Sequence, residues 1–244
     1  MKIIHISDIH LTENGREIWG VNTLDHFCKA IERIKALDGI DGIFVSGDLS
    51  DDGSRWTYEF IDKAFSEIGI PTFCCPGNHD NLDEFYNGYN PLFYSNCDIV
   101  KLCGWDFIML NSAVRDMSRG LISQEKLSNL IQRCKGKVAV VLHHPPIEQE
   151  GWLNRKLLEN RGHFNDIIKH AENVRLVLYG HTHYHTKEII NGKVYCSAPS
   201  IGFAFNPNLN KFEIANGEEG FSIIEIDGDN VVITKEQLYD IGKP

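Results

Sequence analysis

Short apolar runs rich in β-branched residues recur along this chain, and they limit what it can fold into. Each run spans four to six residues, which is the length of a buried strand and too short for a buried helix. The runs lie at residues 2–7, 42–46, 71–75, 106–111, 137–142, 174–179, 193–197, 221–226 and 231–234. The sequence therefore predicts a protein built on buried β-strands.

Helical patterns lie between several of these runs. Apolar residues recur at three- and four-residue intervals within 24–34, 56–68 and 127–134. Asn22 or Thr23 is suited to begin the first helix, and Gly69 to end the second. The third helix is expected to begin at Ser123 and to stop at Gly136. Strands and helices thus alternate over most of the first 180 residues, which favours an α/β fold.

The rest of the chain is expected to belong to the same domain. After residue 192 the pattern changes to strands without helices, which suggests a closing hairpin. No internal repeat and no linker rich in Pro or Ser marks a boundary, and 244 residues suit one large core. We therefore expect a single domain over 1–244, with a strand-rich part from about 187.

The formal net charge of −10 argues against a nucleic-acid partner, because an acidic surface repels phosphate backbones. Bound divalent cations would reverse the sign locally, so a small anionic substrate remains compatible with this charge. The seven cysteines are odd in number and show no CxxC spacing. The apolar stretch at the N-terminus is broken by His5 and stopped by Asp8, so it is too short for the core of a signal peptide, and no apolar run approaches the ~20 residues of a membrane span. The expected location is the reducing cytoplasm, without membrane contact.

A polar block suited to metal binding follows each of five apolar runs. The blocks are Asp8 with His10, then 47–51, 77–80, 143–146 and 180–183. Because ligands of open α/β sheets bind at the carboxyl ends of the strands, the five blocks are expected to converge. The two-residue spacing of Asp8 and His10, like that of His181 and His183, directs both side chains to one side of an extended segment.

The candidate ligands are carboxylates, imidazoles and one amide: Asp8, His10, Asp48, Asn78, His143, His181 and His183. This set contains no thiolate, so it suits Mn, Fe, Co or Zn better than a cysteine zinc site or an all-oxygen calcium site. Seven ligands exceed the needs of one ion and suit two ions bridged by a carboxylate. Paired metals are a recurring device for attack on phosphate esters.

The five blocks read Asp-x-His, Gly-Asp-x-x-Asp, Gly-Asn-His-Asp, His-His-Pro-Pro and Gly-His-Thr-His, and in this order they resemble the motif series of the calcineurin-like metallophosphoesterases. The resemblance covers about residues 1–186. It implies an α/β fold, a four-layer αββα sandwich of two mixed β-sheets flanked by helices. It also implies that Asp8, His10 and His183 hold one ion, that Asn78, His143 and His181 hold the other, and that Asp48 lies between them. A metal-bridging hydroxide would then attack phosphorus.

The same resemblance implies catalytic roles for His79 and Asp51. His79 matches the family's histidine that contacts the phosphate or protonates the leaving oxygen, and Asp51 matches the carboxylate that orients it. Asn78 and His79 are expected to touch the substrate. His144 is placed with them because it could approach the substrate, although support of the ligands is the favoured role for its ring.

Within the family, the segments 7–11, 47–51, 142–146 and 197–200 are most similar to the class III cyclic-nucleotide phosphodiesterases. This implies hydrolysis of 3′,5′-cyclic AMP or a related phosphodiester, with a homodimer formed through the C-terminal part. A glycerophosphodiesterase or a broad phosphomonoesterase is an alternative. A metal-loaded, non-catalytic interaction scaffold is an alternative of another class, and His79 and Asp51 argue against it because a scaffold needs no acid.

Other reactive residues have simpler interpretations. Cys74 and Cys75 complete a buried strand, so we expect core packing and no redox role. Arginines could clamp a phosphate from the segments flanking the His-His block, but solvent exposure is the favoured interpretation. The arginines concerned are Arg115, Arg119, Arg155 and Arg161.

Overall fold

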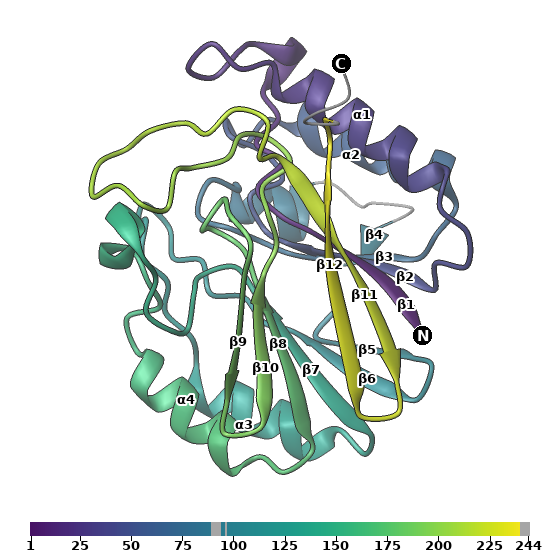
Figure 1. Ribbon diagram of the computed structural model, residues 1–244, viewed down its shortest axis with the longest axis vertical. Coiled ribbons are helices and arrows are strands. Elements are labelled where there is room, and N and C mark those ends of the chain that lie inside the picture. The colour runs from purple at the N-terminus through teal and green to yellow at the C-terminus, as the bar shows by residue number, and fades with distance from the viewer. Residues whose placement is uncertain (89–93, 96, 240–244) are drawn as a thin grey trace.

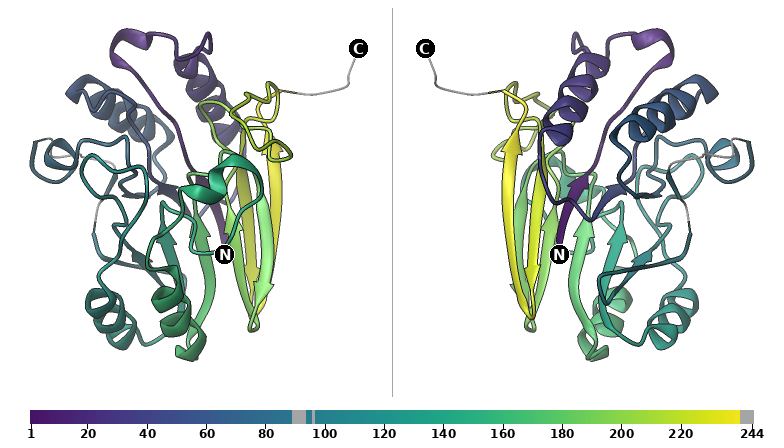
Figure 2. Two further views of the ribbon diagram at one scale, coloured as in Figure 1. Left: turned by 90° about the vertical axis from the view of Figure 1, so that its left-hand side faces the viewer. Right: turned by 90° about the vertical axis from the view of Figure 1, so that its right-hand side faces the viewer.

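The computed structural model describes residues 1–88, 94–95 and 97–239. Two six-stranded sheets face each other, and helices cover their outer faces (Figure 1). The expected four-layer sandwich of two mixed sheets is therefore confirmed. Figure 2 shows the yellow β11–β12 hairpin on the side of the molecule opposite the blue helix α2.

The first sheet has the strand order β12-β11-β1-β2-β3-β4. Its strands are β1 (Lys2–Ile6), β2 (Gly42–Ser46), β3 (Thr72–Cys75), β4 (Tyr94–Ser95), β11 (Gly220–Asp227) and β12 (Asn230–Gln237). Strands β1 to β4 run parallel, whereas β11 lies antiparallel to both β1 and β12. The hairpin expected at the end of the chain is thus present and extends the sheet beyond β1.

The second sheet has the strand order β5-β6-β7-β8-β10-β9. Its strands are β5 (Ile99–Leu102), β6 (Trp105–Met109), β7 (Lys137–Leu142), β8 (Val174–Tyr179), β9 (Thr186–Ile190) and β10 (Lys193–Ser197). Strands β6, β7, β8 and β10 are parallel, and β5 and β9 pair antiparallel at the edges. The parallel strands of each sheet end at a common edge.

Four helices complete the layers: α1 (Thr23–Lys35), α2 (Arg55–Ile68), α3 (Gln124–Arg133) and α4 (Arg161–His170). Short helical turns η1 (Glu13–Gly15), η2 (Glu84–Gly88) and η3 (Gly151–Arg155) lie in loops. Helices α1 and α2 bury Phe27 and Phe65 against the first sheet, and α3 and α4 bury Ile131 and Phe164 against the second. A third apolar cluster fills the space between the sheets, where the ring centroids of Phe44 and Phe107 lie 4.1 Å apart.

The helix ends follow the sequence closely. The side chain of Asn22 accepts the backbone N–H of Asp25, and Gly69 ends α2 with a left-handed φ of 70°. Ser123 caps α3 as expected, but α3 ends at Arg133, before Gly136. The sequence pattern did not predict α4, β4, β5 or β9. In α4 only two residues are fully buried, and β9 is an exposed edge strand, so neither carries a strong apolar periodicity.

Within the described ranges, no helix combines the length and the apolar composition needed to cross a membrane.

Candidate metal centre

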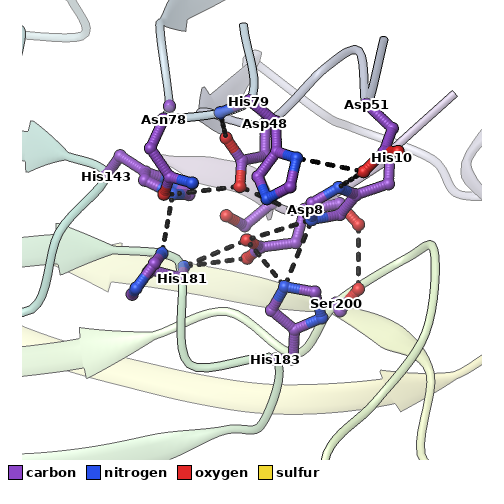
Figure 3. Close-up of polar contacts among 12 residues, drawn as sticks. Asp8, His10, Asp48, Asp51, Asn78, His79, His143, His181, His183 and Ser200 are labelled. Atoms are coloured by element: carbon purple, nitrogen blue, oxygen red, sulfur yellow. Dashed lines mark hydrogen bonds and ion pairs between the residues drawn. The ribbon is translucent and has the colours of Figure 1, made fainter. Parts of the chain in front are cut away.

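The five polar blocks meet at the edge where the parallel strands end. Asp8 and His10 follow β1, Asp48 follows β2, and the remaining blocks follow β3, β7 and β8. Figure 3 shows the side chains of all seven candidate ligands, with His79 and Asp51, directed toward one another. The geometry thus brings together residues that lie up to 175 positions apart in sequence, from Asp8 to His183.

A first cluster consists of Asp8, His10 and His183. The His10 Nε2 atom lies 3.2 Å from His183 Nε2, which in turn lies 3.3 Å from Asp8 Oδ1. All three side chains are buried. The backbone N–H of His181 donates to both carboxylate oxygens of Asp8, at 3.1 and 3.0 Å, and so fixes the orientation of this carboxylate.

A second cluster consists of Asn78, His143 and His181. The His143 Nε2 atom lies 3.2 Å from Asn78 Oδ1 and 3.1 Å from His181 Nδ1. Asp48 joins the two clusters, because its Oδ2 lies 3.5 Å from His10 Nε2 and 3.2 Å from His143 Nε2. Its other oxygen accepts the backbone N–H of His79 at 2.8 Å.

Hydrogen bonds on the far side of three imidazoles determine which nitrogens face the centre. His10 Nδ1 donates to the Asp51 carboxylate at 3.0 Å, His183 Nδ1 to the Phe203 carbonyl at 2.6 Å, and His143 Nδ1 to the Ser46 carbonyl at 2.8 Å. The Nε2 atoms of His10 and His183 therefore carry lone pairs when Nδ1 alone holds the proton, and Nε2 of His143 also faces the centre. Such partners are typical of metal-ligating histidines.

The arrangement of these lone pairs shows whether the residues are suited to bind metal ions. The Nε2 atoms of His10 and His183 are 3.2 Å apart, and both carry lone pairs if the Nδ1 atoms hold the protons. Two facing lone pairs repel each other in a buried site, whereas a cation that both can ligate removes the repulsion. The metal ions that the motif resemblance implies therefore fit the donor set at this edge.

The backbone at the ligands is strained. Five candidate ligands have a left-handed φ between 50° and 68°: Asp8, His10, Asp48, His181 and His183. The prediction of an extended backbone at the Asp8/His10 and His181/His183 pairs is therefore wrong, because left-handed turns direct these side chains to the centre. This region is unfavourable for residues with a Cβ, at a cost of about 1–3 kcal/mol each, and such strain is concentrated at functional sites. Glycines allow the close approach of the loops, since a Cβ on Gly180 would lie 1.8 Å from Ser7 Oγ and one on Gly77 would lie 2.1 Å from Asp48 Oδ1.

His79 is the exposed member of the site, with 40% of its side chain accessible. Its Nδ1 lies 3.1 Å from Asp51 Oδ1, as the motif predicted. Burial opposes charge on the ring, but Asp48 and Asp51 outweigh burial and raise the pKa of His79 to about 9 in the metal-free centre. The same competition between burial and Asp48 raises the pKa of His143 to about 9.

Two supporting residues were not found from the sequence. The buried Asp80 carboxylate accepts the backbone N–H groups of Gly77, Ser50 and Leu49 at 2.8, 3.0 and 3.2 Å, so it ties the Asp48 loop to the Asn78 loop. Its position at the end of Gly-Asn-His-Asp was the available signal. Ser112, which contacts the His144 ring, is the second supporting residue, and no local sequence motif marked it.

His144 is fully buried, and its Nδ1 lies 2.9 Å from Ser112 Oγ. The ring centroid lies 4.9 Å from that of His181, and Nε2 has no hydrogen-bond partner among the described residues. The ring thus lies beside the second cluster. Burial lowers the pKa of His144, with the neighbouring His143 acting in the same direction, so the ring is neutral.

The remaining expectations concern cysteines and arginines. Cys74 and Cys75 are buried, and burial raises the pKa of both thiols, which confirms core packing. Three of the four arginines form exposed ion pairs with the protein's own carboxylates: Arg115 with Asp83, Arg119 with Glu159, and Arg161 with Glu148. Arg155 donates to the carbonyl of Trp152. The favoured interpretation, solvent exposure, is therefore confirmed for all four arginines.

Residues 1–185 match the calcineurin-like phosphoesterase family. The whole chain aligns with 94% of a 3′,5′-cyclic-nucleotide phosphodiesterase of Nostoc sp. at 29% identity, and 96% of it aligns with 89% of a 3′,5′-cyclic adenosine monophosphate phosphodiesterase of Haemophilus influenzae at 28% identity.

Solved structures with the same fold are much more distant in sequence. A dimetal phosphatase from Danio rerio superposes with a TM-score of 0.73 at 9% identity, covering 98% of this chain and 97% of that one. GAP50, described as the anchor in the inner membrane complex of Plasmodium, superposes with a TM-score of 0.65 at 12% identity, covering 98% and 84%. At these identities the likeness shows the fold alone.

Proposed function

The chain belongs to the calcineurin-like phosphoesterase family, and on this basis we propose that it is a dinuclear phosphodiesterase that hydrolyses 3′,5′-cyclic nucleotides, cyclic AMP first among them. That it is a metal-dependent hydrolase of phosphoric esters follows from the family. The names of its relatives in Nostoc and Haemophilus support the cyclic-nucleotide substrate, since both align over nearly their whole length.

The observation that carries the dinuclear proposal is the position of Asp48. Its Oδ2 lies 3.5 Å from His10 Nε2 in the first cluster and 3.2 Å from His143 Nε2 in the second. A carboxylate between two sets of facing donors is the arrangement that two neighbouring ions require. We assign Asp8, His10 and His183 to one ion, Asn78, His143 and His181 to the other, and Asp48 to both.

Bound metal ions supply Lewis-acid stabilisation of the phosphoryl oxygens and generate a nucleophile from water near neutral pH. The chain's own residues position the substrate. Asp51 holds Nδ1 of His79, which leaves Nε2 of that exposed ring to contact the phosphate or to donate a proton to the leaving oxygen. Asn78 is half-buried, so its amide is also assigned to the substrate, whereas the fully buried His144 ring lies beside the second cluster and is assigned to support of the ligands.

The metals are proposed to be Mn, Fe, Zn or Co, because the donors are nitrogen and oxygen without a thiolate. All seven cysteines are free, which supports a reducing compartment such as the cytoplasm. The substrate is proposed to be a small phosphodiester rather than nucleic acid, in keeping with the net charge of −10. A single domain over 1–244 and a homodimer remain predictions.

An interaction scaffold is the competing hypothesis from another class. The likeness to GAP50 shows that this fold also serves as an anchor, so the fold by itself does not decide between the two. The pair of His79 and Asp51 favours catalysis, because it places a proton-bearing ring at the accessible rim of the clusters. A glycerophosphodiesterase or a phosphomonoesterase would use the same groups, and substrate comparison separates them.

The test is hydrolysis of bis(p-nitrophenyl) phosphate, p-nitrophenyl phosphate and 3′,5′-cyclic AMP by Mn-loaded protein, beside His79→Ala, a chelated sample and the control His163→Ala. His163 is exposed on α4, away from the clusters. We expect diester turnover that is lost on chelation, reduced by about 10²- to 10⁴-fold in His79→Ala and unchanged in the control. Absence of turnover with two bound metals would favour the scaffold. Preference for the monoester would favour the phosphatase.

A further inference from the structure

An exposed pair of aromatic rings borders the metal centre. Trp19 is 60% exposed and Phe212 is 42% exposed, although both are large apolar side chains. Their ring centroids lie 4.6 Å apart at an interplanar angle of 63°. Trp19 belongs to the loop between β1 and α1, and Phe212 to the loop between β10 and β11, so two distant segments meet at this end of the sandwich (Figure 1).

A buried ring connects this pair to the candidate ligands. The centroid of Phe203 lies 5.0 Å from that of Trp19, 4.8 Å from that of His10 and 4.6 Å from that of His183. Phe203 is only 1% exposed. A single aromatic ring, that of Phe203, therefore separates Trp19 from the first ligand cluster. A small substrate held at that cluster is long enough to reach Trp19.

Phe212 also packs against other aromatic rings. Its ring centroid lies 5.3 Å from that of Phe205 and 5.7 Å from that of Trp152. Phe205 in turn stacks on His183, with centroids 4.2 Å apart and an interplanar angle of 16°. Both exposed rings thus rest on buried rings that contact a candidate ligand, which fixes their position relative to the clusters.

The backbone at Trp19 gives a second, independent observation. The backbone N–H of Ile18 donates to the Val21 carbonyl at 3.0 Å, and the N–H of Val21 donates to the Ile18 carbonyl at 2.9 Å. These bonds close a two-residue turn in which Trp19 and Gly20 have φ values of 49° and 78°. Asn-Gly is the preferred pair for such a turn, and a bulky residue in the left-handed region is strained.

Stability therefore does not account for a tryptophan at this turn. The indole is mostly exposed and recovers little free energy by burial, while its backbone is strained. Asparagine would suit the turn better. A large flat surface facing solvent beside a candidate active site is instead suited to stacking against another flat ring.

We propose that Trp19 and Phe212 form an aromatic subsite that binds the base of the nucleotide substrate. The proposal rests on the phosphodiesterase function proposed above and specifies its substrate class as phosphodiesters that carry a flat ring. Stacking depends on the π face and not on a hydrogen-bond pattern, so the subsite accepts purines and pyrimidines with limited discrimination. Glycerophosphodiesters lack such a ring and gain nothing from it.

A matched pair of ligands isolates the contribution of the base. 5′-AMP and ribose 5-phosphate carry the same sugar phosphate and differ in the adenine. We would titrate Mn-loaded protein with each by calorimetry, in the wild type, in Trp19→Asn and in Phe212→Ala. The expected result is a dissociation constant for AMP that rises about tenfold in each variant, against an unchanged constant for ribose 5-phosphate.

Two controls separate binding from folding. Ile189→Ala removes another exposed apolar side chain, 70% accessible, from β9 near the end of the sandwich opposite the metal edge, and should leave both dissociation constants unchanged. Trp19→Asn should melt at or above the temperature of the wild type, because Asn suits the turn. A lower melting temperature would contradict the argument from the turn.

The outcomes distinguish this inference from the proposed function. Equal affinity of the wild type for AMP and ribose 5-phosphate, or an AMP constant that stays the same in both variants, overturns the subsite even if bis(p-nitrophenyl) phosphate is hydrolysed. Loss of AMP binding in the variants of a protein that hydrolyses no phosphodiester supports the subsite and overturns the catalytic proposal. The calorimetric measurement requires no turnover, so both results can be obtained.

Discussion

The carboxylate of Asp51 lies 3.0 Å from Nδ1 of His10. The motif assigned Asp51 to His79, and the same oxygen does lie 3.1 Å from Nδ1 of that ring. Asp51 therefore holds two imidazoles of different proposed function, a metal ligand and a general acid. Its pKa is lowered, because its hydrogen bonds to these two rings outweigh the opposing effect of its burial.

This shared contact predicts that Asp51→Asn impairs metal binding as well as catalysis. The amide offers a weaker acceptor to His10, and loss of such outer partners costs about 10- to 100-fold in metal affinity or activity. Metal content at limiting Mn, measured by mass spectrometry, should fall in Asp51→Asn but not in His79→Ala. If Asp51→Asn keeps its full metal content, the role of Asp51 is limited to orienting His79.

Asn78→Ala should remove one metal and most of the activity together. The Asn78 Oδ1 atom lies 3.2 Å from His143 Nε2 and is one of three donors in the second cluster. The expected content is one equivalent of Mn in place of two. The assignment of Asn78 fails if neither metal content nor diester hydrolysis changes.

Metal binding should stabilise the fold. The facing lone pairs of His10 and His183 and the buried carboxylates of Asp8 and Asp48 repel one another without a cation. A free metal concentration about one hundred times the dissociation constant adds about 2.7 kcal/mol, which corresponds to a rise of about 5–10 °C in melting temperature. Thermal scans with Mn and with a chelator measure this difference. Identical melting curves would argue against a folded-state metal site.

Asp80→Ala should destabilise the protein, although Asp80 is not one of the proposed metal ligands. The substitution leaves the buried backbone N–H groups of Gly77, Leu49 and Ser50 without their acceptor, at a cost of about 3 kcal/mol or more. Urea unfolding measures the loss, and Asp166→Ala on the exposed face of α4 is the control. A change below about 1 kcal/mol would mean that water or a rearranged loop satisfies these donors.

Local patterns in the sequence identified nine of the twelve strands among the described residues, as well as the chemistry of the site. The apolar runs at 42–46, 137–142 and 193–197 correspond to β2, β7 and β10 residue for residue. They could be read from the sequence because a strand buried on both faces is continuously apolar over a short length. The edge strand β9 was missed for the opposite reason, since its middle residues face solvent and carry no burial pattern.

The sequence by itself determined which donors are available and at which strand ends they lie, because residue type and strand position are local properties of the chain. Only the tertiary structure decided that Asp51 holds two rings, that Asp80 joins two loops, and that Trp19 meets Phe212 across 193 positions. These contacts arise where separate loops of the packed sheets and helices are brought together. No spacing along the chain records which loops will become neighbours, since that depends on how the two sheets pack against each other.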